Sequence, residues 1–349
     1  MVALRCVVAF YLLGTTAVSV DAAEQGPLAT GASFAARDTL DCGAEASEDA
    51  QQCLKELRWA PGDFSVDLQP AEPGCGDWLV RFPSARPIGN PINDRVAMEW
   101  FAARDEKGAV RKTRAVVVVH ESGKRMTVGR IIARGVNSHG LHAFLLQLPG
   151  YGARRDEQLS DLERGLNSMQ QAIADVRRAR DAVAALPVVD DSVVAVQGTS
   201  LGGFVVATVA GLDRGYERVF ILLAGGDLQE VIFNGAKDAA KVRKKLAEAG
   251  VTDEQIKGLA RQVEPLRLAH RIDPAATWLY SGKFDDVVPP KCSSALATAA
   301  KLPATHHIEM DADHYSGIIH LPKVVRAICE QTAAPAAAEA VFGAASDAP

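Results

Sequence analysis

The stretch VVAVQGTSLGGFVVATVAGL at residues 193–212 decides the fold. Its first part, Val193–Val196, is an apolar, mostly β-branched run typical of a buried strand, and Phe204–Leu212 has the composition of a buried helix. Between them, Gly198–Gly202 fits the pattern GxSxG, in which a serine lies on a tight strand-to-helix turn. The context predicts that Ser200 projects from the carboxyl edge of a sheet as a nucleophile. It also places the Leu201 N–H at a helix start, where it can stabilise an oxyanion. The alternative is a glycine-rich turn with an idle serine.

Strand and helix patterns alternate along the rest of the chain. Predicted strands cover residues 64–68, 78–82, 97–102, 115–120, 143–148, 192–197, 219–223, 277–280 and 307–310; predicted helices cover 126–136, 161–186 and 204–212. The continuous β-branched run within 115–120 is typical of a strand buried on both faces of a parallel sheet. The alternation predicts a three-layer α/β fold, with a mostly parallel sheet and helices on both faces.

One segment interrupts this alternation. Residues 227–270 show no strand pattern and read as mostly helical, with the basic residues Lys241, Arg243, Lys244 and Lys245 close together. An insert after a sheet strand, near the face where ligands bind, predicts a small helical cap or lid. A solvated helical decoration is the alternative, because a run of charges is usually a solvated face.

A serine nucleophile needs a base and an acid, which should follow it in the order acid, then histidine. The acid is expected in the turn after the strand at 277–280, where Asp285 is the first choice and Asp286 the second. Both could instead be solvated turn residues. The base is expected to be His314, in the loop between the last strand and the last helix. Asp227 is the next candidate for the acid. His306, His307 and His320 are less suited, because they lie in strand or helix patterns.

The second oxyanion donor is expected in the loop His120-Glu121-Ser122-Gly123, after an earlier strand. The backbone N–H of Ser122 is the preferred donor, with that of Glu121 as the alternative. No second histidine follows at the HExxH spacing, and the cluster of Asp311, Asp313 and His314 is a weak metal site. The sequence therefore predicts neither a metal nor a cofactor.

Composition narrows the class of protein further. The 349 residues are 48% hydrophobic and 23% charged, with a net charge of -5 and a pI of about 5.9. This composition is that of a globular protein, and no basic block suggests nucleic acid as a partner. Residues 1–22 resemble a secretory signal, with Arg5 before an apolar run and small residues before the expected cut. The run is short for a membrane span, so an exported protein, periplasmic or secreted, without a stable membrane anchor is expected.

The remaining chain divides into an N-terminal extension at 23–63, a main domain at 64–332 that contains the cap at about 227–270, and a disordered tail at 333–349. Beyond Cys6, five cysteines remain. In an oxidising compartment some should pair, most easily Cys42 with Cys53, or Cys292 with Cys329. Burial of all five as small hydrophobic residues is the alternative.

From about residue 64 to 332 the chain resembles the α/β-hydrolase superfamily, and most of all its dienelactone hydrolase-like and esterase-like members. The resemblance rests on the loop at 120–123, on Leu148-Pro149-Gly150-Tyr151-Gly152, on the turn at Ser200, and on the stretch 282–289 followed by His314. It implies an eight-stranded, mostly parallel sheet and a Ser200–Asp285–His314 triad. The chain departs from the family's usual His-Gly at Glu121.

The function expected from this resemblance is that of a serine hydrolase that cleaves a small-molecule carboxylic ester through an acyl-enzyme. A serine peptidase of the prolyl-oligopeptidase type is one alternative. A non-catalytic binding protein that retains the fold is another.

Overall fold

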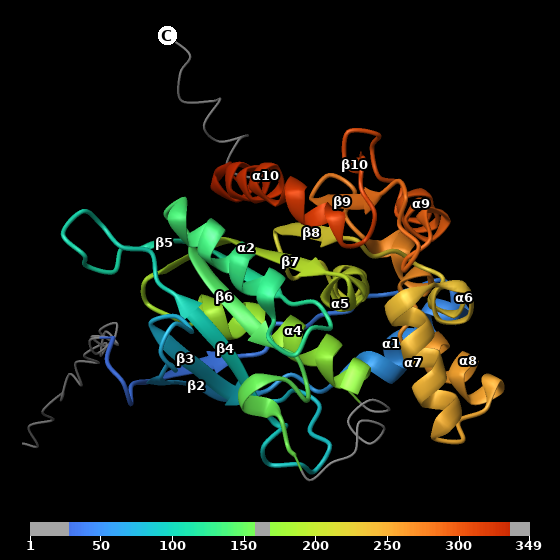
Figure 1. Cartoon of the computed structure of the whole chain (residues 1–349). Coiled ribbons are helices and arrows are strands. Elements are labelled where there is room, and N and C mark those ends of the chain that lie inside the picture. The colour runs from blue at the N-terminus through green and yellow to red at the C-terminus, as the bar shows by residue number, and fades with distance from the viewer. Residues whose placement is uncertain (1–27, 158–167, 336–349) are drawn as a thin grey trace, which may run out of the picture.

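A single sheet organises the part of the chain that the computed structural model describes, residues 28–157 and 168–335 (Figure 1). Its strands are β1 (Ser33–Arg37), β2 (Asp63–Pro70), β3 (Trp78–Pro83), β4 (Arg95–Phe101), β5 (Thr113–Val119), β6 (His142–Gln147), β7 (Val189–Thr199), β8 (Arg218–Leu222), β9 (Thr277–Gly282) and β10 (His307–Met310). The expected signal at 1–22, residues 161–167 of a predicted helix and most of the expected tail lie outside the described residues.

The order of the strands is β1-β2-β3-β4-β6-β5-β7-β8-β9-β10. Strands β1 to β4 pair antiparallel with one another, and β4 pairs antiparallel with β6. From β6 through β10 every pairing is parallel, so the expected mostly parallel sheet is confirmed. The described chain has ten strands rather than the eight implied by the resemblance. Part of the difference is β1, which pairs with β2 and comes from the stretch 23–63, where no element was predicted.

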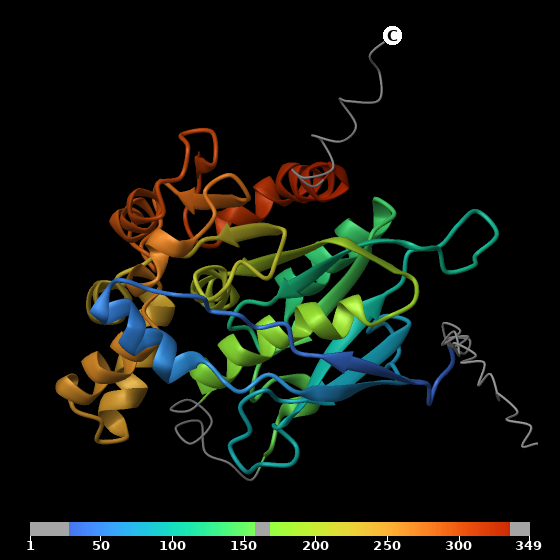
Figure 2. The same ribbon diagram turned by 180° about the vertical axis from the view of Figure 1, so that it is seen from behind.

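Helices cover both faces of the sheet, as the apolar runs require. They are α1 (Glu48–Leu57), α2 (Thr127–Ser138), α4 (Ser168–Ala184), α5 (Leu201–Ala210), α9 (Pro290–Ala299) and α10 (Leu321–Ala333). On β5, Val116 and Val118 pack in the cluster that contains α2 and α10, whereas Val117 and Val119 pack in the cluster that contains α1, α4, α5 and α9. Alternate residues of one strand thus pack into hydrophobic cores on opposite faces of the sheet, which gives the expected three layers. Figure 1 views the α2 side, and Figure 2 shows α4 and α1 from behind.

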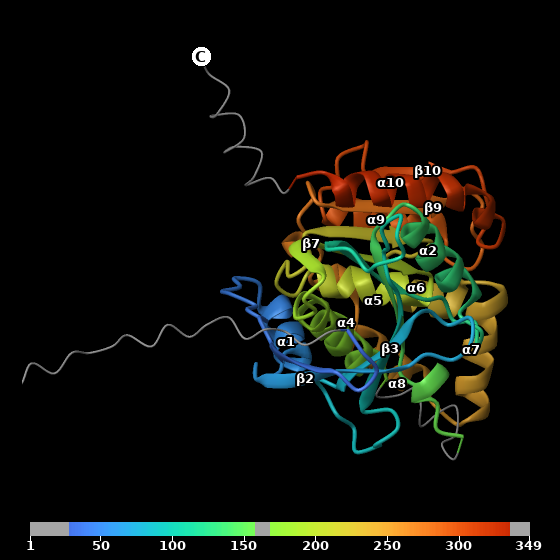
Figure 3. The ribbon, with the colours of Figure 1, turned by 90° about the vertical axis from the view of Figure 1, so that its left-hand side faces the viewer.

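The segment between β8 and β9 forms the cap. It contains α6 (Leu228–Asn234), α7 (Lys237–Glu248) and α8 (Asp253–Gln262), followed by two short 3-10 turns, Pro265–Arg267 and Ala269–Arg271. The cap helices stand beside α5 at one end of the molecule (Figures 1 and 3). Because Ser200 lies directly before α5, the insert is placed beside the turn that carries the predicted nucleophile.

The five cysteines of the described residues are all unbonded, so the expected pairings of Cys42 with Cys53 and of Cys292 with Cys329 are not formed. Burial raises the pKa of the Cys53 thiol to about 11 and those of Cys292 and Cys329 to about 12. These three side chains behave as small hydrophobic residues of the core. Within residues 28–157 and 168–335, no helix has the length and apolar character needed to cross a membrane.

Candidate active site

Ser200 lies on a strained turn between β7 and α5. Its backbone has φ 52° and ψ −113°, a conformation rare for a residue with a side chain. A Cβ at Gly198 would approach the Gly202 oxygen to 2.2 Å, and a Cβ at Gly202 would approach the Val119 oxygen to 2.3 Å. The two glycines of the motif are therefore required by close packing of the backbone. The turn presents the Ser200 hydroxyl beyond the end of the strand.

His314 and Asp285 complete a chain of hydrogen bonds from Ser200. The Ser200 Oγ lies 3.0 Å from His314 Nε2, and His314 Nδ1 lies 2.7 Å from Asp285 Oδ2. The other carboxylate oxygen of Asp285 accepts the backbone N–H groups of Val287 and Val288 at 2.9 and 2.8 Å. The Asp285 side chain is only 2% exposed and that of His314 8% exposed. Asp285 is thus held from three directions, and it orients the imidazole toward Ser200.

The other acid candidates point elsewhere. The Asp286 carboxylate forms a largely exposed ion pair with Lys237 at 3.0 Å. Asp227 caps α6, where its carboxylate accepts the backbone N–H of Glu230. Of the other histidines considered, His306 hydrogen-bonds backbone carbonyl groups and His307 lies 2.9 Å from the Ser281 hydroxyl. His320 is the residue directly before α10, and its Nε2 has no hydrogen-bond partner among the described residues.

The loop after β5 is held by His120. Its backbone oxygen accepts the N–H of Gly202 at 3.1 Å, which ties this loop to the serine turn. Its Nε2 accepts the N–H of Leu148 at 3.1 Å, so the proton is on Nδ1, which donates to the Glu121 oxygen. The ring is fully buried, and burial lowers the pKa of His120 to about 4. His120 is therefore neutral near neutral pH, and its hydrogen bonds hold the loop after β5 in place.

Glu121 explains how the loop departs from the family's His-Gly. Its carboxylate accepts the backbone N–H groups of Val128 and Gly129, both at 3.1 Å, in the first turn of α2. The residue that precedes α2 makes no side-chain cap, so Glu121 supplies the missing acceptor. The side chain thus turns toward the helix, and the next residue, Ser122, lines the cavity that contains Ser200.

Tyr151 is a residue of the site for which the sequence suggested no role. Its hydroxyl donates to the Ser122 oxygen at 3.1 Å, and its ring packs edge-on against His120 at 4.5 Å between centroids. It therefore supports the loop that carries the expected oxyanion donor, Ser122. The other expected donor, Leu201, is the first residue of α5, so its N–H has no intrahelical acceptor. For Tyr151, its place in the motif at 148–152 was the only sequence signal.

A cavity of about 870 Å³ lies between the cap and the core and includes Ser200 in its wall. The core side contributes Leu201, Phe204 and Val287, and the cap contributes residues of all three of its helices. The insert therefore lies over the cavity that contains Ser200. A pocket of this size and partly apolar character suits a small organic ligand.

Two contacts join the cap directly to the loops that carry Asp285 and His314. Lys237 pairs with Asp286, the neighbour of Asp285. The hydroxyl of Tyr315, the neighbour of His314, donates to Asp238 at 2.9 Å, and the Lys237 ammonium lies 5.1 Å from the Tyr315 ring centroid. The start of α7 therefore contacts both the loop that holds Asp285 and the loop that holds His314. No sequence pattern signalled these contacts.

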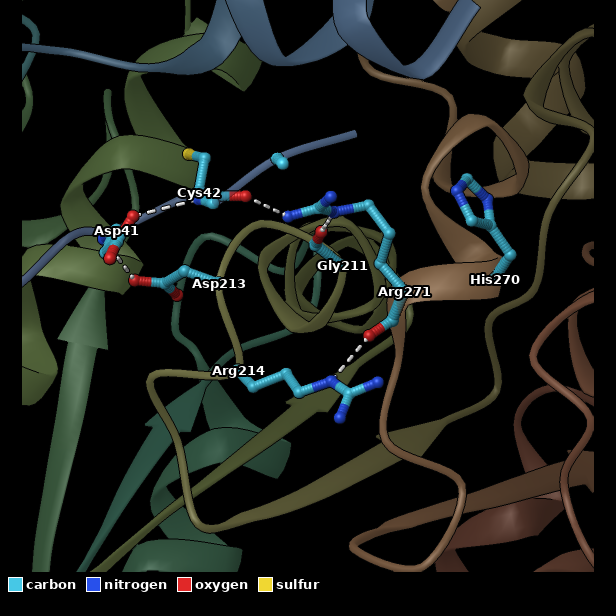
Figure 4. A pocket seen from close by; sticks show the side chains of 9 residues that line it. Asp41, Cys42, Gly211, Asp213, Arg214, His270 and Arg271 are labelled. Atoms are coloured by element: carbon cyan, nitrogen blue, oxygen red, sulfur yellow. Dashed lines mark hydrogen bonds between the residues drawn. The ribbon is translucent and has the colours of Figure 1, made fainter. Parts of the chain in front are cut away.

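A second, smaller pocket of about 370 Å³ lies at the other end of α5 (Figure 4). There the Arg271 guanidinium donates to the carbonyl oxygens of Cys42 and Gly211 and pairs with Glu45. Ser200 precedes α5 and Gly211 follows it, so ten helical residues, roughly 15 Å, separate this pocket from Ser200. Its polar groups tie the N-terminal segment to the core, and the pocket is not part of the site.

The loop that carries His314 does not assemble a metal site. The Asp313 carboxylate is occupied by the backbone N–H groups of Tyr315 and Ser316 and by the Ser316 hydroxyl. Across the described ranges, no three His, Cys, Asp or Glu side chains gather as a metal centre would require.

The sheet order, the serine turn and the cap define the class: the chain has the α/β-hydrolase fold. Among solved structures, an acetyl xylan esterase from Paenibacillus sp. R4 matches with a TM-score of 0.57 at 17% identity, over 82% of this chain and 95% of the esterase. Acetyl xylan esterase 1 from Thermoanaerobacterium sp. JW/SL YS485 matches with a TM-score of 0.55 at 16% identity, over 84% of this chain and 96% of the esterase.

A puromycin-hydrolyzing peptidase of Mycobacterium tuberculosis also matches, with a TM-score of 0.55 at 17% identity, over 78% of this chain but only 46% of the peptidase. No protein-family model and no curated protein sequence matches the chain. At these identities the likeness establishes the fold.

Proposed function

We propose that this chain is a serine hydrolase that cleaves carboxylic esters, with Ser200 as nucleophile, His314 as base and Asp285 as acid. The observation that carries the proposal is the unbroken hydrogen-bonded chain of these three side chains, at 3.0 and 2.7 Å, on a strained turn beside a cavity. Strain and buried carboxylates at one point of a fold are typical of an active site.

The proposed reaction has two halves. His314 Nε2 takes the hydroxyl proton as Ser200 Oγ attacks the ester carbonyl carbon, and Asp285 stabilises the imidazolium. The carbonyl oxygen becomes an oxyanion, which the N–H groups of Leu201 and Ser122 receive. The intermediate collapses, the C–O bond to the alcohol breaks, and His314 protonates the leaving alcohol. Water, deprotonated by His314, then attacks the acyl-enzyme and releases the acid and free Ser200.

The extent of the structural matches supports an ester rather than a peptide as substrate. The two acetyl xylan esterases are covered over 95% and 96% of their length, whereas the peptidase is covered over 46%. A peptidase remains the second candidate, since that enzyme shares the fold at a similar TM-score. The proposed reaction is the same acyl transfer in both cases, so substrate assays must separate them.

The test compares p-nitrophenyl esters with peptide p-nitroanilides, together with labelling by a fluorophosphonate probe. Ester turnover and labelling, with little or no turnover of p-nitroanilides, are the expected results. Faster turnover of the p-nitroanilides would support the peptidase instead. Absence of both labelling and turnover would support a non-catalytic binding protein.

We also propose that the chain is exported after removal of residues 1–22, and that it then has no stable membrane anchor. The support is the short apolar run behind Arg5, with small residues before the expected cut. N-terminal sequencing of protein recovered from the periplasm or the medium tests this. A start at or next to Ala23 is expected, and an intact N-terminus on membrane-bound protein would contradict it.

A further inference from the structure

Helix α7 turns an apolar stripe toward the cavity at Ser200. Ala239, Val242 and Leu246 line that cavity, and their spacing of three and four residues places them on one face of the helix. Lys241 and Lys244, by contrast, have side chains that are 74% and 77% exposed. Two members of the basic cluster, Lys241 and Lys244, thus lie on the solvated face of α7, whereas Lys245 borders the cavity beside the apolar stripe.

The other two cap helices repeat this arrangement. On α6, Leu228 and Val231 line the cavity at a spacing of three, and on α8, Ile256 and Leu259 do so at the same spacing. Across from them, Phe204 and its neighbours on the core side complete an apolar wall that reaches Ser200. Three amphipathic helices therefore direct apolar side chains into one space beside the nucleophile, which indicates a binding surface for an apolar group.

The size of the cavity and the exposure of Val242 indicate how large that group is. About 870 Å³ is near the upper end of the range of roughly 300–1,000 Å³ found for pockets that hold drug-sized ligands. A two-carbon acetyl group would occupy a small part of it. Val242 is 50% exposed and lines the cavity, so an apolar ligand there would remove this side chain from water. Charged side chains also line the cavity, so the ligand needs polar atoms as well; they include Lys124, Asp238, Lys245 and Glu248.

From these observations we infer that the cap cavity is a specificity pocket for a large apolar group, an extended chain or a ring system, carried on either the acyl or the alcohol side of the ester. The inference rests on the proposed ester hydrolase function and goes beyond it by naming the substrate class. It sets this chain apart from an enzyme whose pocket fits acetyl groups. The residue that sets the preference is Val242, at the middle of the α7 stripe.

The experiment measures kcat/KM for two series of esters. One lengthens the acyl chain of p-nitrophenyl esters from acetate to octanoate, and the other lengthens the alcohol of alkyl acetates from ethyl to octyl. In at least one series, kcat/KM should rise about threefold or more for each added methylene, as burial of a methylene in an apolar pocket predicts. The series that rises identifies which side of the ester enters the cavity.

Three variants locate the preference in the cap. Val242→Asp places a carboxylate in the cavity and should lower kcat/KM for the longest ester of the rising series at least about tenfold. The reason is that an apolar chain bound beside the carboxylate would remove water from this charge, which costs free energy. The loss for the shortest ester, which leaves most of the pocket empty, should be several-fold smaller than the loss for the longest ester. Val242→Trp fills the space without a charge and should also act selectively on the longest ester. Ala247→Asp is the matched control, because Ala247 is exposed on the same helix and does not line the cavity.

Binding to the Ser200→Ala variant gives a readout that does not depend on turnover. Calorimetry should detect octanoate or octanol but neither acetate nor ethanol, and adding Val242→Asp should weaken that binding at least about tenfold. Ester series that fall with length, or chain-length profiles that the Val242 variants leave unchanged, would overturn the inference. Selective binding without turnover would leave the pocket in place and overturn the proposed hydrolase function alone.

Discussion

Replacing Asp285 by asparagine should lower kcat by several orders of magnitude. In the native site, Asp285 Oδ1 accepts the N–H groups of Val287 and Val288, and Oδ2 faces His314 Nδ1 at 2.7 Å. An asparagine that keeps the first two bonds must present its NH₂ group to Nδ1, where two donors cannot pair. The imidazole then carries its proton on Nε2 and no longer accepts the Ser200 proton. Loss of the acid in this way costs on the order of 10⁴ in kcat in a serine triad.

The neighbouring change, Asp286→Asn, is the matched control. It removes one carboxylate from the same turn, but that carboxylate pairs with Lys237 at the surface, where both side chains are more than 40% exposed. Exposed ion pairs contribute little, so kcat should fall by less than about tenfold. The backbone oxygen of Asp286, which accepts the N–H of Ala236, is unaffected by the substitution.

The assay is steady-state hydrolysis of p-nitrophenyl butyrate, with the thermal midpoint of each variant recorded to show that it is folded. Asparagine closely matches aspartate in shape, so both variants should remain folded under the assay conditions. If Asp286→Asn is the more damaging change, the acid is Asp286 and the hydrogen bond to Asp285 does not operate in catalysis. If both variants retain activity within about tenfold, neither residue of this turn is the acid, and the proposed Ser200–His314–Asp285 triad is refuted.

Three further predictions concern the framework of the site. Burial lowers the pKa of His120 to about 4 in the native chain, whereas an unfolded histidine has a pKa of about 6.5. Between these two pH values, the unfolded chain binds a proton at His120 and the native chain does not. The unfolding free energy should therefore fall as pH drops through that window, by on the order of 3 kcal/mol, and His120→Gln should flatten this slope in urea titrations; equal slopes would contradict the assignment. Glu121→Ala removes the acceptor for two N–H groups of α2 and should cost about 1 kcal/mol of stability, together with a loss of kcat that Glu121→Gln largely restores. Arg154→Met leaves the fully buried Asp175 without its partner and should destabilise the fold by about 3–5 kcal/mol in urea unfolding, whereas a loss below about 1 kcal/mol would show that the pair is not buried in solution.

Local patterns in the sequence were enough to predict the parts of the site that depend on one strand and the turn that follows it. The apolar run before Gly198 and the helix pattern after it placed Ser200 on a turn, and the structure has that turn. The order of the chain then led to Asp285 and His314, which the structure brings within hydrogen-bonding distance of one another. Each of these residues follows a strand of the parallel region, and the carboxyl ends of parallel strands meet at one edge of the sheet.

Features that depend on contacts between distant segments were not predictable. The sequence of residues 33–37 has little strand pattern of its own. These residues form β1 by pairing with the exposed edge of β2. The bond from Tyr315 to Asp238 joins residues 77 apart in the chain, and neither residue type signals it. The cysteine pairs were expected from the compartment and from closeness along the chain, but all five cysteines are unbonded, and Cys53, Cys292 and Cys329 are buried in the core. An oxidising compartment favours disulfides in general, but it does not determine which cysteine side chains lie close enough to bond.

Mass spectrometry of the fluorophosphonate-labelled protein tests the central claim most directly. A phosphonyl adduct should appear on the peptide that contains Ser200, and it should be absent from the Ser200→Ala variant, which should also lose ester hydrolysis by far more than about tenfold. An adduct on a different serine, or hydrolysis by Ser200→Ala within about tenfold of the native chain, would contradict the account.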